Sequence, residues 1–473
     1  MSDPLEYRDR PVSREAGREI FTETGIGDPY GAGIALPLLL ALVRSRPATF
    51  GGDMGAMADR FGMLRREKAT KDDLPIGMHE TRDPNTGVSF VMMNCALCHT
   101  ERLRTGSGES LAVGIGNRRI RIHAYERALL SAAMDPALDE AGLLREADAI
   151  AVSARLSWPT DVGAAIVRAT LGEWRKRAAS RLSVVEALAE GLPGRVATIE
   201  SFTLAMNARG HHLPIPAVPG FTRVPDVRSF RYRESLSYDG VGVGSPTVLV
   251  AEADFAFGVR TEWYESHRHL GTSLYMFLRH FERDLRFPGA VDRGLAEQGR
   301  GVFGMACARC HGTYGRSGGH ASLDYDESVV PLASIGTDAA RANAVTDAFV
   351  VAANEDVATK GLVHTRRTQG YVPPPLIDVW ARGPFGHNGQ WPTLAVMAEK
   401  PEKRPTRFRV EPDAAYDLEG VGTAWAAGEG KAGSASSYVF DAARPGHSVL
   451  GHSYLSDLPA SEARAVIEYL KTL

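Results

Sequence analysis

The chain has 473 residues, of which 44% are hydrophobic, a composition that is ordinary for a soluble globular protein and a length that predicts two or three domains. The formal net charge of −3 argues against nucleic acid and against an anionic membrane surface as main partners. The apolar run at 34–43 is shorter than the about 20 residues that a membrane-spanning helix needs, so the sequence predicts no membrane span.

A short helix is predicted over 13–21, where a serine can cap the first turn. This helix contains Gly17 and Phe21, and the same pattern of a glycine and a later phenylalanine recurs over 292–303. A glycine inside a helix allows close packing against another helix. We therefore expect two similar helices, one in each half of the chain.

Residues 25–94 are rich in Gly, Pro and Met, which predicts irregular chain with one strand at 88–93. Between 120 and 208 apolar residues recur at intervals of three and four, which predicts helices. The periodic stretches are 141–155, 160–175 and 183–206. This helical block contains no cysteine, so we interpret it as scaffold.

The second half of the chain begins with an extended connection, predicted over 209–260 from its prolines and glycines. A helix is predicted over 271–284. Further along, a polar, glycine-rich segment reaches about residue 325, and a helix is predicted near 337–353. The chain is expected to close with an amphipathic helix that begins near Ser461.

Two copies of a Cys-x-x-Cys-His motif use every cysteine in the protein. The first motif consists of Cys95, Cys98 and His99, and the second motif consists of Cys307, Cys310 and His311. In this signature of c-type haem, two thiols form thioether bonds to one porphyrin and the adjacent histidine ligates its iron. The sequence therefore predicts two covalently bound haem c groups, held by these six residues.

Zinc and dithiol redox chemistry are the alternatives to haem at these motifs. Structural zinc sites usually close two cysteine pairs within roughly 15–20 residues of each other, whereas Cys95 and Cys307 belong to opposite halves of the chain. A thioredoxin-like cysteine pair would leave the repeated histidine without a role. Covalent haem is therefore the favoured interpretation.

The stretch around a His-Asn-Gly triplet carries a resemblance to a known family. Residues 380–394, which read WARGPFGHNGQWPTL, resemble a segment of the di-haem cytochrome c peroxidase superfamily. Further stretches resemble the rubber-oxygenase-like branch of that superfamily: 74–77, 94–100, 404–408, 445–454 and 467–473. The resemblance covers both ends of the chain and is loose between 120 and 290.

The resemblance implies a mainly α fold with two cytochrome c-like haem domains. The periodic block between 120 and 208 departs from the family and adds a helical insertion, and the stretches rich in Gly and Pro add long irregular loops. We expect an N-terminal cytochrome c-like domain with the insertion over 1–215, a connecting segment over 216–284, and a C-terminal cytochrome c-like domain over 285–473. The helical insertion would then cover the first haem or shape the access to it.

The sixth iron ligand of the second haem is also implied by the resemblance. In the rubber-oxygenase-like branch this ligand is a histidine that corresponds to His452, whereas the classical peroxidases use a methionine, for which Met397 is suitably placed. We favour His452 opposite His311, because neutral imidazole is a common iron ligand.

The resemblance implies an oxidoreductase that activates peroxide or dioxygen at the first haem, with His99 as its catalytic residue, and relays electrons through the second haem. The expected partners are a small redox protein or small-molecule electron donor, and peroxide, dioxygen or an organic substrate. A non-catalytic electron-transfer cytochrome and a haem-based ligand sensor are the alternative functions.

Haem attachment through cysteine normally follows export, which predicts a periplasmic or secreted protein. Residues 1–7 are polar and acidic and lack the basic start and apolar run of a signal peptide. We therefore interpret the sequence as a mature form with a replacement start methionine, or as one with a misassigned start.

Overall fold

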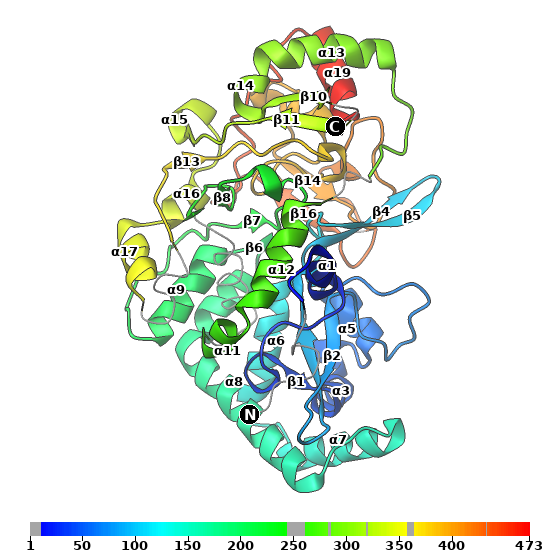
Figure 1. Ribbon diagram of the computed structural model, residues 1–473, viewed down its shortest axis with the longest axis vertical. Coiled ribbons are helices and arrows are strands. Elements are labelled where there is room, and N and C mark those ends of the chain that lie inside the picture. Colours follow the sequence, from blue (N-terminus) through cyan, green and yellow to red (C-terminus); the bar gives the residue numbers. More distant parts are fainter. Residues whose placement is uncertain (1–10, 244–260, 282–284, 318–319, 357–363, 432) are drawn as a thin grey trace.

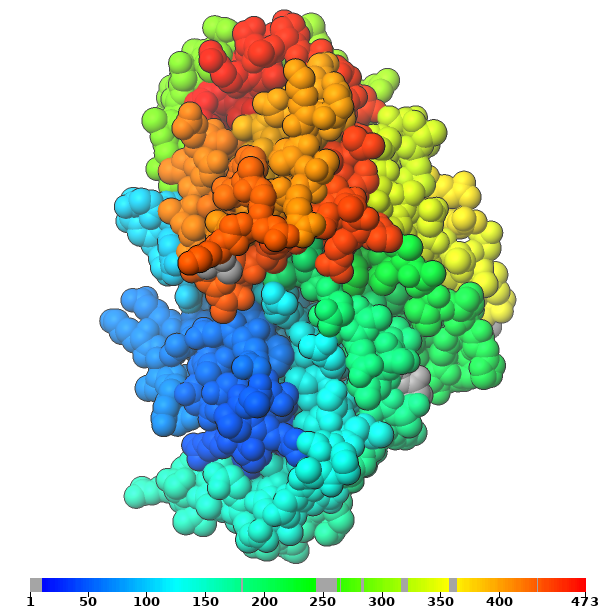
Figure 2. Space-filling view, turned by 180° about the vertical axis from the view of Figure 1, so that it is seen from behind, coloured from blue at the N-terminus to red at the C-terminus, as the bar shows by residue number. Residues whose placement is uncertain are grey.

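The structure is a computed structural model that describes residues 11–243, 261–281, 285–317, 320–356, 364–431 and 433–473. The polar N-terminal stretch 1–7, residues 244–260 of the predicted connection and the end of the predicted helix at 282–284 lie outside the described residues. Figure 2 shows the N-terminal part of the chain, in blue, and the C-terminal part, in orange and red, gathered toward opposite ends of the molecule.

The prediction of a mainly α fold is wrong. The structure is 42% helical and 14% strand, with several small sheets. Each motif runs directly into an antiparallel hairpin: Thr100–Thr105 (β4) with Gly108–Val113 (β5), and Thr313–Ser317 (β10) with His320–Asp324 (β11). These strands are mostly polar and glycine-containing, so they lack the apolar alternation by which a half-buried strand is recognised in a sequence.

Two crossed helix pairs repeat the same arrangement at the two motifs. The helices are α1 (Arg14–Thr22) with α12 (Arg268–Arg279), and α13 (Arg293–Ala306) with α19 (Ala460–Leu470). A side chain at Gly17 would overlap the carbonyl oxygen of Ser273, and one at Gly299 would overlap that of Ala465. Both glycines therefore permit backbone contact between crossing helices, as the sequence predicted.

Phe21 and Phe303, the phenylalanines that follow these glycines in the predicted pattern, pack where the same helices cross. The ring of Phe21 lies 5.4 Å from that of Phe277, and the ring of Phe303 lies 5.3 Å from that of Tyr469. Helix α12 belongs to the segment 216–284 that we expected to be a connection, yet it packs on the first helix of the chain (Figure 1).

The helical block occupies the lower part of Figure 1. It consists of α6 (Ile122–Met134), α7 (Glu140–Ala154), α8 (Thr160–Ala189) and α9 (Thr198–Ala208). Helix α8 is longer than predicted, and the prediction over 183–206 missed the break between α8 and α9. The residues 191–194 in this break include two glycines and a proline, which do not continue a helix.

The Met-rich N-terminal segment packs against this block. It comprises α2 (Pro29–Ala32), β1 (Ile34–Ala35), α3 (Leu36–Ser45), α4 (Pro47–Phe50), α5 (Met54–Arg60), β2 (Met78–Arg82) and β3 (Ser89–Met93), and its strands form a sheet in the order β1-β3-β2. The apolar run becomes α3, a helix buried in the largest core. Within the described ranges, no helix is long and apolar enough to cross a membrane.

Short elements join the halves and complete the C-terminal part. Between the halves lie β6 (Arg195–Val196), β7 (Thr222–Arg223), β8 (Ser235–Leu236), β9 (Gly242–Val243) and α11 (Thr261–Ser266). The later elements are α14 (Ala308–His311), β12 (Val330–Pro331), α15 (Leu332–Ile335), α16 (Ala340–Ala344), α17 (Asp347–Glu355), β13 (Gly370–Tyr371), α18 (Leu394–Met397), β14 (Arg407–Val410), β15 (Trp425–Ala427) and β16 (Tyr438–Asp441). The helix predicted near 337–353 is thus two helices, α16 and α17.

Candidate functional site

Each Cys-x-x-Cys-His motif forms one tight turn of chain. In the first motif, the backbone N–H groups of Cys98 and His99 both donate to the carbonyl oxygen of Cys95, at 3.3 and 2.9 Å. The corresponding bonds to the carbonyl oxygen of Cys307 measure 3.1 and 3.0 Å in the second motif. The turn brings two thiols and an imidazole close together, as attachment to one porphyrin requires.

A proline carbonyl orients the histidine of each motif. His99 Nδ1 lies 3.0 Å from the carbonyl oxygen of Pro225, and His311 Nδ1 lies 2.8 Å from that of Pro374. A carbonyl oxygen only accepts, so each Nδ1 carries the proton and each Nε2 keeps its lone pair for a metal. Burial lowers the pKa of both histidines, which favours this neutral form.

The two motifs line a single cavity of about 1560 Å³. All four cysteines and both histidines border it. Burial raises the pKa of Cys95 and of Cys98 to about 12, so these thiols are protonated at neutral pH. The cavity therefore joins the two motifs in one continuous space.

His452 faces the second motif across this cavity. Its ring centroid lies 6.2 Å from that of His311. Imidazole–metal bonds are about 2.0 Å long and a ring centroid lies roughly 1.1 Å from its nitrogens, so two imidazoles on opposite sides of one metal have centroids roughly 6 Å apart. The observed spacing fits one iron between the two rings.

The loop that carries His452 is held in place by its backbone. The N–H of His452 donates to the carbonyl oxygen of Ile335 at 2.8 Å, and the residue has a φ of 45°, a left-handed conformation that is uncommon for residues other than glycine. Gly451, just before it, packs so closely on Gly336 that a side chain there would overlap the backbone. The position of the imidazole is therefore fixed by the fold.

Unpaired polar atoms in the cavity fit a haem group. Among the described residues, His452 Nδ1 and Arg382 Nε are buried without a hydrogen-bond partner. Burial lowers the pKa of His452 to about 4, so the ring is neutral at physiological pH, the form that ligates iron. Met397 also borders the cavity, but the ring spacing favours His452 over it as the residue opposite His311.

The cavity at the first motif has a different environment. The ring nearest to His99 among the described side chains is that of Phe21, at 6.5 Å. Beyond it, the cavity extends along α6, α8 and α9. Their lining includes the apolar side chains of Ile122, Leu129, Val162, Ile166, Trp174, Phe202 and Leu204 and the charged side chains of Glu126, Glu173, Lys176 and Arg177. The helical block thus borders the cavity at the first motif.

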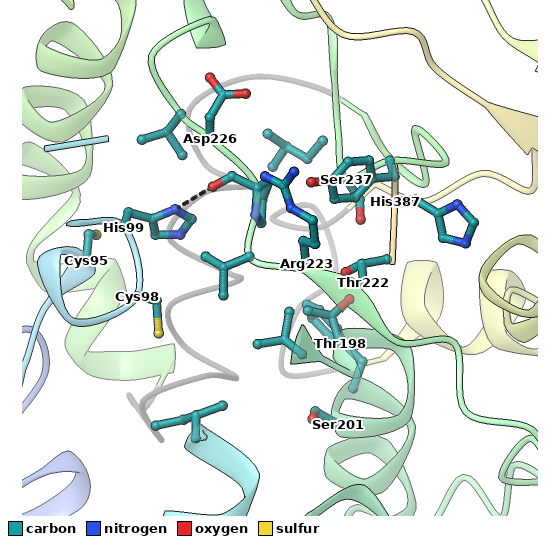
Figure 3. Close-up of a pocket in the computed structure, with 18 of the residues that line it drawn as sticks. Cys95, Cys98, His99, Thr198, Ser201, Thr222, Arg223, Asp226, Ser237 and His387 are labelled. Carbon is teal, nitrogen blue, oxygen red and sulfur yellow. Dashed lines mark hydrogen bonds between the residues drawn. The ribbon is translucent and has the colours of Figure 1, made fainter. Parts of the chain in front are cut away.

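Polar side chains also line the part of the cavity that lies across from His99 (Figure 3). Figure 3 shows Thr198 and Ser201 of α9 on one side of the space and Thr222, Arg223 and Ser237 opposite His99. A haem carries two carboxylates as well as an apolar macrocycle, so a mixed lining of this kind fits its two ends. These residues were not identified in the sequence, where they follow no motif.

The two proline carbonyls were also missed by the sequence reasoning, although a signal exists. Arg233 follows Pro225 at the same interval as Arg382 follows Pro374, and an Asp-Gly pair and an Asn-Gly pair come next at matching positions. This weak internal repeat marks the two loops that cover the motif histidines.

The turns, the histidine orientation and the cavity together fit a c-type cytochrome. A family model described as "RoxA-like, cytochrome c-like" matches residues 370–409, which include the His-Asn-Gly segment. This match supports a relationship to rubber-oxygenase-like cytochromes over that part of the chain. A cytochrome c-like domain implies covalently bound haem c, and such domains are typically extracytoplasmic.

Two proteins of Sinorhizobium fredii are similar to part of the chain. The uncharacterized protein y4iJ is 28% identical over 39% of this chain and 40% of its own length, and the uncharacterized protein y4iM is 27% identical over 39% of this chain and 50% of its own length. The chain thus spans half or less of the length of these curated relatives.

Proposed function

We propose that the protein is a di-haem c-type cytochrome oxidoreductase that activates peroxide or dioxygen at the haem on His99 and relays electrons through the haem on His311. Two copies of the same turn, each with a histidine held by a proline carbonyl, support two haem groups. The observation that carries the division of roles is the asymmetry between the two histidines across one cavity.

The second haem is suited to electron relay. His311 and His452 face each other at the spacing that fits one iron between them. An iron with a protein ligand on each side has no open position for a substrate, so it can pass electrons but cannot bind peroxide or dioxygen without losing a ligand.

The first haem is suited to the reaction. The cavity beside His99 continues into the space along α6, α8 and α9, which leaves room for a small oxidant and for an organic substrate. A haem that binds an oxidant supplies the oxidising chemistry, and the protein controls access and the polarity of the pocket. His99 is accordingly the proposed catalytic residue.

The expected electron donor and the expected location of the protein follow from this assignment. We expect a small redox protein or a small molecule to deliver electrons, in the periplasm or outside the cell. The division into an N-terminal haem domain over 1–215, a connection over 216–284 and a C-terminal haem domain over 285–473 remains part of the proposal, with α12 contributing to the first haem unit.

Carbon monoxide tests the proposal. Protein produced with export should contain two covalent haems, and the cysteine pairs Cys95/Cys98 and Cys307/Cys310, replaced in turn by alanine, should each remove one. In the reduced protein, carbon monoxide should bind one haem and leave the other unchanged, and His99→Ala should abolish any turnover of peroxide or dioxygen. Two haems with no carbon monoxide adduct would instead support a non-catalytic electron-transfer cytochrome.

A further inference from the structure

A buried ion pair connects the loops that hold the two motif histidines. Asp226 directly follows Pro225, and its carboxylate lies 2.8 Å from Nη1 of Arg382. The side chains of Asp226 and Arg382 are only 8% and 5% exposed. Arg382 also donates to the carbonyl oxygen of Pro375, at 2.9 Å, so its guanidinium is anchored in the loop that begins at Pro374.

A second ion pair joins the same two loops, but in this pair the arginine belongs to the first loop and the aspartate to the second loop. Arg228 Nε, from the loop that follows Pro225, lies 2.6 Å from the carboxylate of Asp378, from the loop that follows Pro374. Both side chains are 2% exposed. The two bridges hold the loops together, so the charges of Asp226 and Arg382 stay in fixed positions relative to the histidines.

The two ends of the first bridge belong to the loops of different histidines. Asp226 is the residue next to Pro225, whose carbonyl oxygen accepts from His99 Nδ1. Arg382 Nη1 donates to the carbonyl oxygen of Pro375, the residue next to Pro374, whose carbonyl oxygen accepts from His311 Nδ1. The carboxylate is therefore tied to the loop of the first motif and the guanidinium to the loop of the second motif, whereas the charges of the second bridge follow further along both loops.

We propose that the Asp226–Arg382 ion pair is a fixed dipole between the two haem sites that lowers the reduction potential of the haem on His99 and raises that of the haem on His311. Reduction adds an electron, which a nearby negative charge disfavours and a nearby positive charge favours. The pair is buried, so salt and water screen these charges only weakly. The inference rests on the proposed di-haem function.

The dipole has a functional consequence. The ion pair shifts the two potentials in opposite directions, which favours reduction of the haem on His311 before that of the haem on His99. This order suits a relay haem beside a reactive one.

Potentiometric titration of the holoprotein, followed by visible spectra, tests the dipole. Asp226→Asn should raise the potentials, most strongly that of the haem on His99, and Arg382→Gln should lower them, most strongly that of the haem on His311. Asp356→Asn is the matched control, because it neutralises another carboxylate that is 1% exposed and paired, with Arg209 and His211, and that does not itself border the cavity. This control should leave both potentials unchanged.

A charge reversal separates an electrostatic role from a purely structural one. The double variant Asp226→Arg with Arg382→Asp restores an ion pair in the opposite orientation, so the potential of the haem on His99 should rise and that of the haem on His311 should fall. Wild-type potentials in both single variants would overturn the proposal, and so would a reversed pair that restores the wild-type values.

If the charge-reversed double variant does not fold, the reduction potentials of the two single variants test the proposal. Haem content, measured on the same samples, keeps the proposed function separate. A protein with fewer than two covalent haems would contradict the di-haem function, whereas two haems with unshifted potentials would contradict the dipole alone.

Discussion

The imidazole rings of His311 and His452 lie 6.2 Å apart at an angle of 55°. His311 ends the helical turn α14, whereas His452 comes from the loop that precedes the last helix of the chain. The two rings therefore meet only when these two distant segments of the C-terminal half pack together. We infer that the environment of the second haem reports on the integrity of this half.

Replacing His452 by alanine should convert the haem on His311 from low-spin to high-spin and leave the other haem unchanged, because one axial ligand is removed. Visible and electron paramagnetic resonance spectra measure the change. Met397→Leu is the control, since it alters the alternative ligand and conserves an apolar side chain of similar size. A low-spin spectrum in the alanine variant, with a change in the leucine variant, would assign the ligand to Met397.

Gly299→Ala should destabilise the protein by about 1–3 kcal/mol, because the new methyl group would overlap the carbonyl oxygen of Ala465 where α13 crosses α19. Gly301, on the same helix, has no atom within 4 Å of the position of an added Cβ. Gly301→Ala should therefore be neutral or stabilise by up to about 1 kcal/mol. Denaturant unfolding of the two variants, side by side, measures the difference.

Sequence reasoning succeeded where the information is local. The turn of each motif, the helices that contain Gly17 and Gly299, and the terminal helix depend on neighbouring residues and on apolar periodicity, so they could be predicted. The buried methionines of the N-terminal segment also agree with their interpretation as gap-filling side chains.

The rest of the site depends on contacts between distant segments. Pro225 and Pro374 act through backbone carbonyl oxygens, which every residue has, so no side-chain type reveals their role. The packing of α12 on α1 could not be predicted, because an amphipathic helix shows that it has a partner but not which one. The hairpins that follow the motifs were not predicted, because their polar strands lack the alternation of apolar and polar residues that marks a strand in a sequence.

A buried charge cluster joins the two halves and should be important for stability. Glu101, which is fully buried, pairs with Arg118 and Arg119, and Arg119 Nε also lies 2.7 Å from the carboxylate of Asp413. Arg119→Gln should cost about 3–5 kcal/mol, because it leaves buried negative charge only partly compensated. Thermal unfolding and limited proteolysis measure the loss.

An exposed ion pair provides the control for this cluster. Arg127 pairs with Glu190, and the two side chains are 39% and 72% exposed. Arg127→Gln should change stability by less than about 1 kcal/mol, since solvent screens such pairs. Equal losses in the Arg119 and Arg127 variants would show that burial of the cluster contributes little.

The last prediction concerns access to the first haem along α8. Ala169 borders the cavity, so Ala169→Phe should partly fill this space and slow the binding of carbon monoxide to the reduced haem on His99. Ala169 and Ala179 are both exposed positions of this helix, but Ala179 does not border the cavity, so Ala179→Phe should leave the rate unchanged. Stopped-flow or flash-photolysis spectroscopy measures both rates. Equal rates in the two variants would mean that ligands reach His99 by a route that does not follow α8, and the proposed role of the helical block in controlling access would then fail.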